Sequence, residues 1–332
     1  MLELVFLGTA ASAPSIQRGL PAQVVLYRDE RFLVDCGEGT QRQILRSGLG
    51  FRRLQRVLLT HGHLDHILGL GGLISTFARW EAVEHLEIYG GRRALDRVTD
   101  LIFRVVLPGA RTPVPIDLID VKPGILLESD AFAVEVFSVT HRGPDCFGYR
   151  FSEKPRRPFL PDKAEALGVP AGPVRRDLVN GQSVRLADGR MIHPDDVLGP
   201  DRPGVSIAIV GDTGRVDNLV DAVAGVDVLV CESTYLDCDA DMARRFGHLT
   251  AKQAAWLARE AGARMLALNH LSQRYRVRDI LEETRALHEE TLVTRDFDRL
   301  RVTRDKITLS NEELDSDEVL LAAPVANETV WD

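Results

Sequence analysis

Cysteine and net positive charge are both scarce in this 332-residue chain. Its four cysteines, Cys36, Cys146, Cys231 and Cys238, show no Cys-x-x-Cys spacing. They therefore indicate neither a disulfide framework nor a thiolate zinc site, and we expect all four to be buried small hydrophobic residues. The net charge of −8 argues against a protein that binds nucleic acid with its whole surface, although it leaves room for a local basic patch.

Long apolar runs are also missing. No stretch is long enough to span a bilayer, and residues 1–8 lack the basic region and the apolar core of a signal peptide. We therefore expect a cytoplasmic protein with no membrane contact. With 45% hydrophobic residues and no internal repeat, the chain can bury one large core or two modest ones.

Short runs rich in valine, leucine and isoleucine indicate β-strands. They cover residues 4–7, 24–27, 32–34, 57–59, 132–139, 207–210, 226–230 and 265–268. Helical patterns follow at 252–261 and 279–290. Because the early part is rich in strands and the late part alternates strand with helix, we expect an α/β fold with two sheets covered by helices.

Residues 152–204 do not follow this pattern of apolar strands and helices. Proline stands at positions 155, 158, 161, 170, 173, 194, 200 and 203, and the segment is too long for an ordinary connection in a compact domain. It is either a functional projection or a disordered insert. The alternating run 183–187 followed by Asp188-Gly189 predicts a hairpin, so we favour an extruded arm inserted in a main domain at 1–310. Residues 311–332 are predicted to be an acidic C-terminal tail.

The strongest chemical signal is residues 60–66, Thr-His-Gly-His-Leu-Asp-His, directly after the predicted strand 57–59. A tight loop can direct His61 and His63 to one cation while Asp65 and His66 turn toward a second. Zinc suits these nitrogen and oxygen ligands. A surface histidine cluster is the alternative interpretation.

Three further candidates, His141, Asp212 and His270, each follow an apolar strand. A single histidine at a strand end is more often structural, but the three together complete two sites of about four ligands if Asp212 bridges them. We assign the first site to His61, His63, His141 and Asp212, and the second to Asp65, His66, Asp212 and His270. The remaining histidines at 85, 193 and 288 are interpreted as surface or structural. The glycines in residues 68–72 lack the Lys-Ser/Thr of a P-loop and indicate close helix packing instead.

The His-x-His-x-Asp-His pattern with its later ligands resembles the metallo-β-lactamase superfamily. Four further blocks, residues 6–18, 35–43, 167–174 and 268–275, are similar to the ribonuclease Z family, and the resemblance runs from about residue 3 to about residue 303. It implies an αββα sandwich of two mixed sheets flanked by helices. It also implies a homodimer and an arm at 152–204 that grips the elbow of precursor tRNA. Leu64 stands where this family usually has glycine.

The expected activity is that of an endoribonuclease that removes the 3′ trailer of precursor tRNA and leaves a 3′-hydroxyl. Two divalent cations, zinc or another such as manganese, share a hydroxide that attacks the phosphate. Asp65 can orient that water with its free oxygen. His248 is the candidate acid for the leaving oxygen, because a capping box from Thr250 to Gln253 fixes it ahead of a helix. The resemblance pairs it with Glu232.

Two other functions stay open. The same metal centre serves hydrolases of small esters, lactams or thioesters, because fold does not fix function. A metal-free tRNA-binding subunit could also keep the arm. The long arm and the Gln-Arg-Tyr block at 273–275 favour RNA, and the complete set of ligand positions favours an enzyme.

Overall fold

The structure is a computed structural model that describes residues 1–80, 82–108 and 114–311. It divides into a large unit, residues 1–128, 133–152 and 205 onward, and a small unit, residues 129–132 and 153–204. The predicted acidic tail lies outside the described residues except for Asn311, which ends the last strand. Among the described residues, no helix combines the length and the apolar character needed to cross a membrane.

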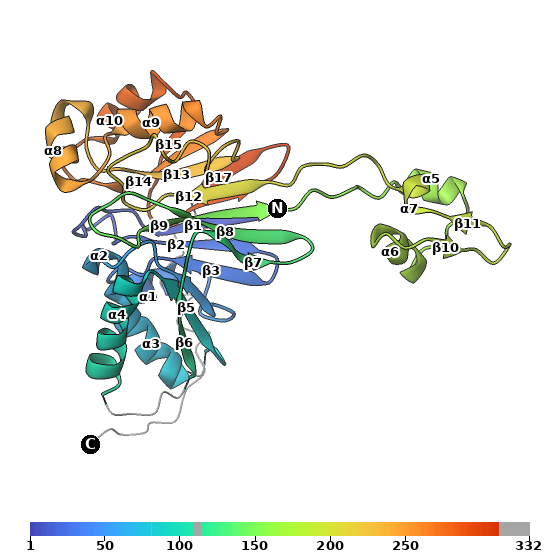
Figure 1. Cartoon of the computed structure of the whole chain (residues 1–332), viewed down its shortest axis with the longest axis horizontal. Coiled ribbons are helices and arrows are strands. Elements are labelled where there is room, and N and C mark those ends of the chain that lie inside the picture. Colours follow the sequence, from blue (N-terminus) through green and yellow to red (C-terminus); the bar gives the residue numbers. More distant parts are fainter. Residues whose placement is uncertain (81, 109–113, 312–332) are drawn as a thin grey trace. The chain divides into compact units, whose positions relative to one another are not determined.

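The large unit contains two mixed sheets (Figure 1). The first has the order β17-β16-β1-β2-β3-β4-β5-β6, with antiparallel pairs from β17 to β3 and parallel pairs from β3 to β6. Its strands are β1 (Leu2–Gly8), β2 (Ala22–Tyr27), β3 (Glu30–Val34), β4 (Arg56–Leu58), β5 (Leu86–Gly90), β6 (Ile116–Asp120), β16 (Asp298–Val302) and β17 (Ile307–Asn311).

The second sheet has the order β15-β14-β13-β12-β9-β8-β7. Its strands are β7 (Gly124–Glu128), β8 (Phe132–Ser138), β9 (Phe147–Glu153), β12 (Ser206–Ile209), β13 (Val228–Ser233), β14 (Met265–Leu271) and β15 (Thr291–Val293). The strands from β12 to β15 run parallel to one another. Parallel strands are buried on both faces, which explains their continuous apolar runs.

Helices cover the outer face of each sheet (Figure 1). The first sheet packs against α1 (Thr40–Arg46), α3 (Gly69–Trp80), α4 (Arg92–Asp100) and the π-helix η1 (Leu101–Val106). The second packs against α9 (Ala251–Glu260) and α10 (Val277–Arg285). Between the sheets, the rings of Phe32 and Phe151 lie 5.5 Å apart, and the Tyr149 hydroxyl donates to the Leu59 carbonyl over 2.7 Å. The predicted αββα sandwich is confirmed.

Two local predictions are wrong. The helix predicted at 279–290 ends at Arg285, because the chain turns there and continues as β15 from Thr291. Cys238 is exposed, because it lies on the short 3-10 helix η2 (Asp237–Asp239) at the surface, which buries none of its residues. The other three cysteines are buried, as expected.

The glycines after the metal loop pack closely, as predicted. A Cβ on Gly69 would lie 1.9 Å from the Gly37 carbonyl oxygen. This contact brings α3 against the loop that follows β3 and leaves no space for a larger residue.

The small unit has its own core. It contains α5 (Pro161–Ala166), α6 (Pro173–Val179), the hairpin strands β10 (Val184–Arg185) and β11 (Met191–Ile192), and α7 (Pro194–Val197). The predicted hairpin is therefore confirmed. Its core is formed by Ala164, Val169, Leu178, Leu186, Ile192, Val197 and Leu198. Two isolated bridges, Arg156 to Arg202 and Phe159 to Leu198, hold its two connecting segments together.

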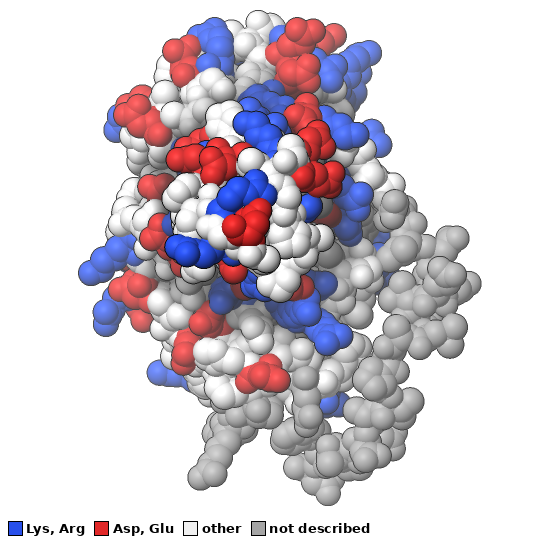
Figure 2. Space-filling view, turned by 90° about the vertical axis from the view of Figure 1, so that its right-hand side faces the viewer, with Lys and Arg blue, Asp and Glu red and all other residues white. Residues whose placement is uncertain are grey.

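Charges of both signs are interspersed on the face drawn in Figure 2. Many arginines pair with nearby carboxylates, such as Arg56 with Glu87 and Arg264 with Asp227. This distribution fits the net charge of −8, so a nucleic-acid site would have to be local.

Candidate metal centre

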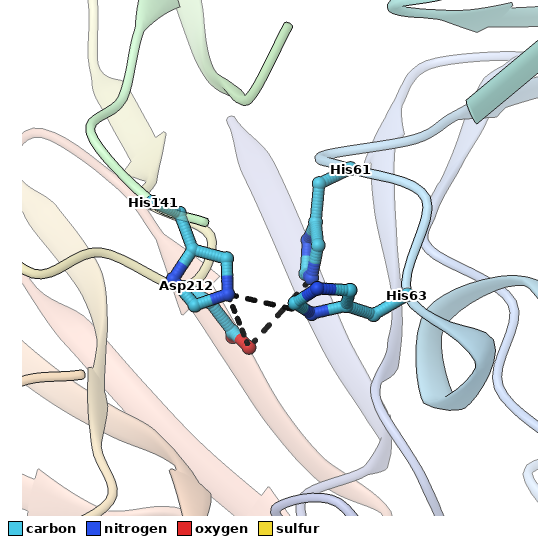
Figure 3. Close-up of side chains that lie close together, drawn as sticks. All are labelled: His61, His63, His141 and Asp212. Carbon is cyan, nitrogen blue, oxygen red and sulfur yellow. Dashed lines mark hydrogen bonds and ion pairs between the residues drawn. The ribbon is translucent and has the colours of Figure 1, made fainter. Parts of the chain in front are cut away.

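The candidate ligands meet where strands of both sheets end. The loop 60–66 follows β4 of the first sheet, whereas His141, Asp212 and His270 lie after β8, after β12 and near the end of β14 in the second. The loop is tied to the second sheet by the Phe147 amide, which donates to the Thr60 carbonyl over 2.8 Å. In Figure 3 the side chains of His61, His63, His141 and Asp212 point toward one another. The two sheets thus close on one cluster of imidazoles and carboxylates.

Asp212 is at the centre of this cluster. Its Oδ2 lies 3.4 Å from Nε2 of His270, 3.5 Å from Nε2 of His66, 3.8 Å from Nε2 of His61 and 4.0 Å from Nε2 of His141. The ligand atoms of His61, His63, His141 and Asp212 all lie within 4.8 Å of one another, and those of Asp65, His66 and His270 do so too. The structure thus brings together all four residues of the first predicted set and three of the second, and Asp212 forms a further group with His248 and His270.

Hydrogen bonds outside the cluster fix the tautomers of His66 and His141. The Asp35 carboxylate lies 2.8 Å from Nδ1 of His66, and the Gly247 carbonyl lies 2.7 Å from Nδ1 of His141. Both oxygens can only accept, so each Nδ1 must carry the proton. The lone pair of each neutral imidazole is then on Nε2, the atom that faces the cluster.

Threonine hydroxyls fix His61 and His270 in the same way. Thr60 donates its proton to Asp35 over 2.8 Å, so its oxygen accepts from Nδ1 of His61 at 3.1 Å. The Thr234 hydroxyl faces the Glu232 carboxylate at 2.6 Å and Nδ1 of His270 at 2.9 Å. The short bond to the carboxylate takes the hydroxyl proton, and Nδ1 of His270 donates to the oxygen.

The result is a set of buried nitrogens without partners. Among the described residues, Nε2 of His61, His66 and His270 is each buried and makes no hydrogen bond. Leaving a buried polar atom unpaired costs about 1–3 kcal/mol, and here three of them converge on one carboxylate. Such a group of directed lone pairs is the donor arrangement that a metal ion requires.

Backbone irregularities direct two of these side chains. His270 has a φ of 52° and lies in a β-bulge, because Glu232 pairs with Asn269 and Ser233 with Leu271. A bulge re-aims a side chain that regular pleating would direct elsewhere. Asp35 has a φ of 58° immediately after β3. A left-handed backbone conformation is energetically unfavourable for a residue other than glycine. Such strained residues are concentrated at functional sites.

The charges of the cluster are strongly coupled. Burial would raise the pKa of Asp212, but the nearby imidazoles of His270 and His66 hold it well below its usual value. Burial would lower the pKa of His66, but Asp212 and Asp35 raise it well above the usual value. Burial, by contrast, holds the pKa of His61 well below its usual value and lowers that of His63 and His141. These three imidazoles are therefore kept in the uncharged form that can bind a cation.

His248 lies beside the cluster, and its Nδ1 faces a glutamate. Its Nδ1 is 3.1 Å from both carboxylate oxygens of Glu232, and the capping box of Thr250 with Gln253 that begins α9 is present. Burial would lower the pKa of His248, but Glu232, followed by Asp212, raises it to about 9. Glu232 thus holds Nδ1 of His248 and favours the protonated form of its imidazole.

Sequence reasoning missed three supporting residues, Asp35, Thr60 and Thr234. Asp35 accepts from the backbone and hydroxyl of Thr60 and from His66, each over 2.8 Å. The available signal was an aspartate directly after the buried strand β3, similar to the place of Asp212 three residues after β12. Leu64 occupies no space in the core behind the loop, because it is 55% exposed.

The fold and the cluster agree with the comparisons to known proteins. Residues 18–294 match the family model of the metallo-beta-lactamase superfamily, so the chain belongs to that superfamily. A ribonuclease Z from a Bradyrhizobium species is 46% identical over 91% of this chain and 100% of its own length. One from Archaeoglobus fulgidus is 36% identical over 92% and 99%.

A solved structure agrees with these relatives. The human tRNase Z, short form, is 25% identical, with a TM-score of 0.64 over 91% of this chain and 99% of its own. Within the superfamily, the chain belongs to the ribonuclease Z family. It is an endoribonuclease of the metal-dependent type.

Proposed function

We propose that this enzyme removes the 3′ trailer of precursor tRNA with two zinc ions held by the histidine and aspartate cluster. The tRNA substrate is supported by the likeness to a tRNase Z. The metal sites are supported by one observation above all, the three buried Nε2 atoms that converge on Asp212 without a partner. Uncharged imidazole nitrogens and carboxylate oxygens, with no thiolate, are ligands that suit catalytic zinc.

Each ion would have about four protein ligands. His61, His63, His141 and Asp212 would hold one ion. Asp65, His66 and His270 would hold the other, together with Asp212, which lies 3.5 Å from His66 and 3.4 Å from His270. Two ions at such a site would activate water and polarise the scissile phosphate. Manganese or another divalent ion is an alternative occupant of the same ligands.

Two residues have roles in proton transfer. Asp65 lies 3.6 Å from His270 and 3.7 Å from His66 through the same Oδ2, which leaves its second oxygen free to accept a proton from the attacking water. His248, charged at neutral pH and held by Glu232 through Nδ1, would protonate the departing 3′-oxygen from Nε2. The Thr213 amide and the Thr234 hydroxyl also donate to Glu232, so this carboxylate is fixed before the substrate arrives.

The small unit would bind the tRNA as the extruded arm expected from the sequence. Not all of its arginines are free to do so. Arg157 donates to the Gly199 carbonyl and pairs with Asp195, and Arg175 donates to the Val169 carbonyl. Arg156 and Arg176 are exposed, so they are the better candidates for phosphate contacts.

Two experiments test the proposal. Incubation with end-labelled precursor tRNA should give a product cut at the 3′ end of the tRNA body with a 3′-hydroxyl, identified by sequencing the product ends. Metal analysis should find about two zinc ions per chain, and a chelator should abolish cleavage. Cleavage of a small ester in preference to precursor tRNA would contradict the proposed substrate.

The homodimer and the cytoplasmic location are also proposed, on the resemblance to the ribonuclease Z family.

A further inference from the structure

An arginine and phenylalanine group lies beside the metal centre. Arg142 directly follows His141, and Phe246 ends α8 (Ala240–Phe246) two residues before His248. The Arg142 guanidinium lies over the Phe246 ring at 5.4 Å from its centroid, and Arg245 lies over the same ring at 5.5 Å. One aromatic ring therefore positions two guanidinium groups.

Backbone contacts hold this group against the ligand loop. Arg142 donates to the Arg245 carbonyl over 2.9 Å, and the Gly247 carbonyl accepts from Nδ1 of His141. Gly247 has a φ of 72°, and a Cβ there would lie 3.4 Å from Cγ of Arg142. The end of α8 thus fits against the His141 loop with little freedom to shift.

The charge of this group is not neutralised within the protein. Arg142 and Arg245 are both exposed, and neither has a carboxylate within 4.0 Å among the residues that the structure describes. The nearby Arg244, by contrast, pairs with Asp241. A third exposed arginine, Arg93 on α4, approaches the same loop, because a Cβ on Gly143 would lie 3.3 Å from its guanidinium.

We propose that Arg142 and Arg245, positioned by Phe246, bind backbone phosphates of the RNA strand next to the scissile bond. This inference rests on the proposed function and deepens it. Exposed guanidinium groups held in a fixed orientation suit phosphate oxygens, and their place beside His141 puts them next to the reacting phosphate. The contacts would orient the strand and add salt-sensitive affinity.

The test compares an Arg142→Ala/Arg245→Ala double variant with wild type on precursor tRNA at several salt concentrations. We expect KM to rise roughly 10-fold or more with kcat changed less than about threefold. Two lost phosphate contacts should also make the slope of log(kcat/KM) against log salt shallower by about 1.4–1.8. Phe246→Leu keeps both charges and should raise KM less, with a slope near that of wild type.

Arg28→Ala is a matched control, because Arg28 lies over the Tyr27 ring at 5.3 Å. Arg28 lies just before β3, at the opposite end of that strand from Asp35 and the metal centre. Its kinetics should equal those of wild type. Bis(4-nitrophenyl) phosphate carries no flanking phosphates, so the double variant should hydrolyse it at the wild-type rate.

Two results would overturn the inference. In the first, the double variant retains the wild-type KM and salt slope. In the second, it loses activity equally on both substrates, which would mean that the arginines support the metal site. Failure of the wild-type enzyme to cut precursor tRNA would instead refute the proposed function itself, together with this inference.

Discussion

The metal centre and the small unit arrange their functional groups in different ways. The centre collects seven side chains from positions between 61 and 270, and it fixes His61, His66, His141 and His270 through Nδ1. The small unit is almost continuous in sequence and has a core of its own. Its proposed phosphate contacts, Arg156 and Arg176, are exposed at the surface.

This difference corresponds to two kinds of task. Chemistry at a phosphate depends on ligand geometry, so a small displacement is costly. Binding a large polyanion depends mainly on charge in roughly the right place. The first task requires long-range tertiary structure, whereas the second can be carried by a local segment. The predictions below probe that division.

The largest effect should come from the centre itself. His63→Ala removes a proposed ligand of one ion, and Asp212→Ala removes the carboxylate proposed to serve both, so each should reduce cleavage of both RNA and a small phosphodiester below detection. Steady-state rates with metal analysis of the purified variants measure this. His85→Ala, at a half-buried histidine paired with Asp117, is the control and should be fully active. Full activity of Asp212→Ala with normal metal content would refute the assignment.

The next effect separates proton transfer from metal binding. His248→Ala should keep both ions yet lose about 10²–10⁴ in kcat on RNA, the usual range for general acid catalysis. A phosphodiester with a nitrophenolate leaving group needs no proton, so the variant should hydrolyse it at close to the wild-type rate. Glu232→Gln should show the same pattern in milder form. Equal losses on the two substrates would place His248 among the supports of the metal centre.

Removing the small unit should affect binding and spare chemistry. Replacing residues 159–198 by a short glycine-rich turn is feasible, because the Gly199 amide already bonds to the Pro158 carbonyl over 2.8 Å. KM for precursor tRNA should rise by roughly 10²-fold, the lower end of what a linked second contact contributes. Hydrolysis of a small phosphodiester should not change. If the folded deletion variant kept the wild-type KM and kcat for precursor tRNA, the small unit would not be a tRNA-binding element, and the proposed division between binding and chemistry would be wrong.

The smallest effect tests the hydrogen bonds that orient the ligands. Asp35→Asn is isosteric, but it places an amide against the Nδ1 proton of His66 and the hydroxyl of Thr60. We expect metal affinity and activity to fall by about 10–100-fold, as is usual for residues that orient ligands. Zinc titration with a competing chelator measures the affinity. Asp29→Asn, at an 81% exposed carboxylate, is the matched control, and an equal loss there would contradict the explanation.

Much of the site could be predicted without coordinates. The loop 60–66 carries three histidines and an aspartate within a few residues, and no packing requirement explains that density. His141 and Asp212 could be found because each lies three residues after the end of a strand, in the loops where functional groups gather. The capping box joins Thr250 and Gln253, which are only three residues apart. The start of α9 could therefore be predicted from the sequence, and with it the position of His248 just before the helix.

The sequence by itself determined the candidate ligands, most strand positions and the existence of a separate segment near 152–204, because each depends on residues close together in the chain. Only the tertiary structure decided that Asp35 supports His66, that Thr234 sets the tautomer of His270, and that a bulge turns His270 toward Asp212. Hydrogen-bond partners separated by 31 or 36 residues leave no periodic pattern, since they meet only after neighbouring strands have paired, β3 with β4 and β13 with β14.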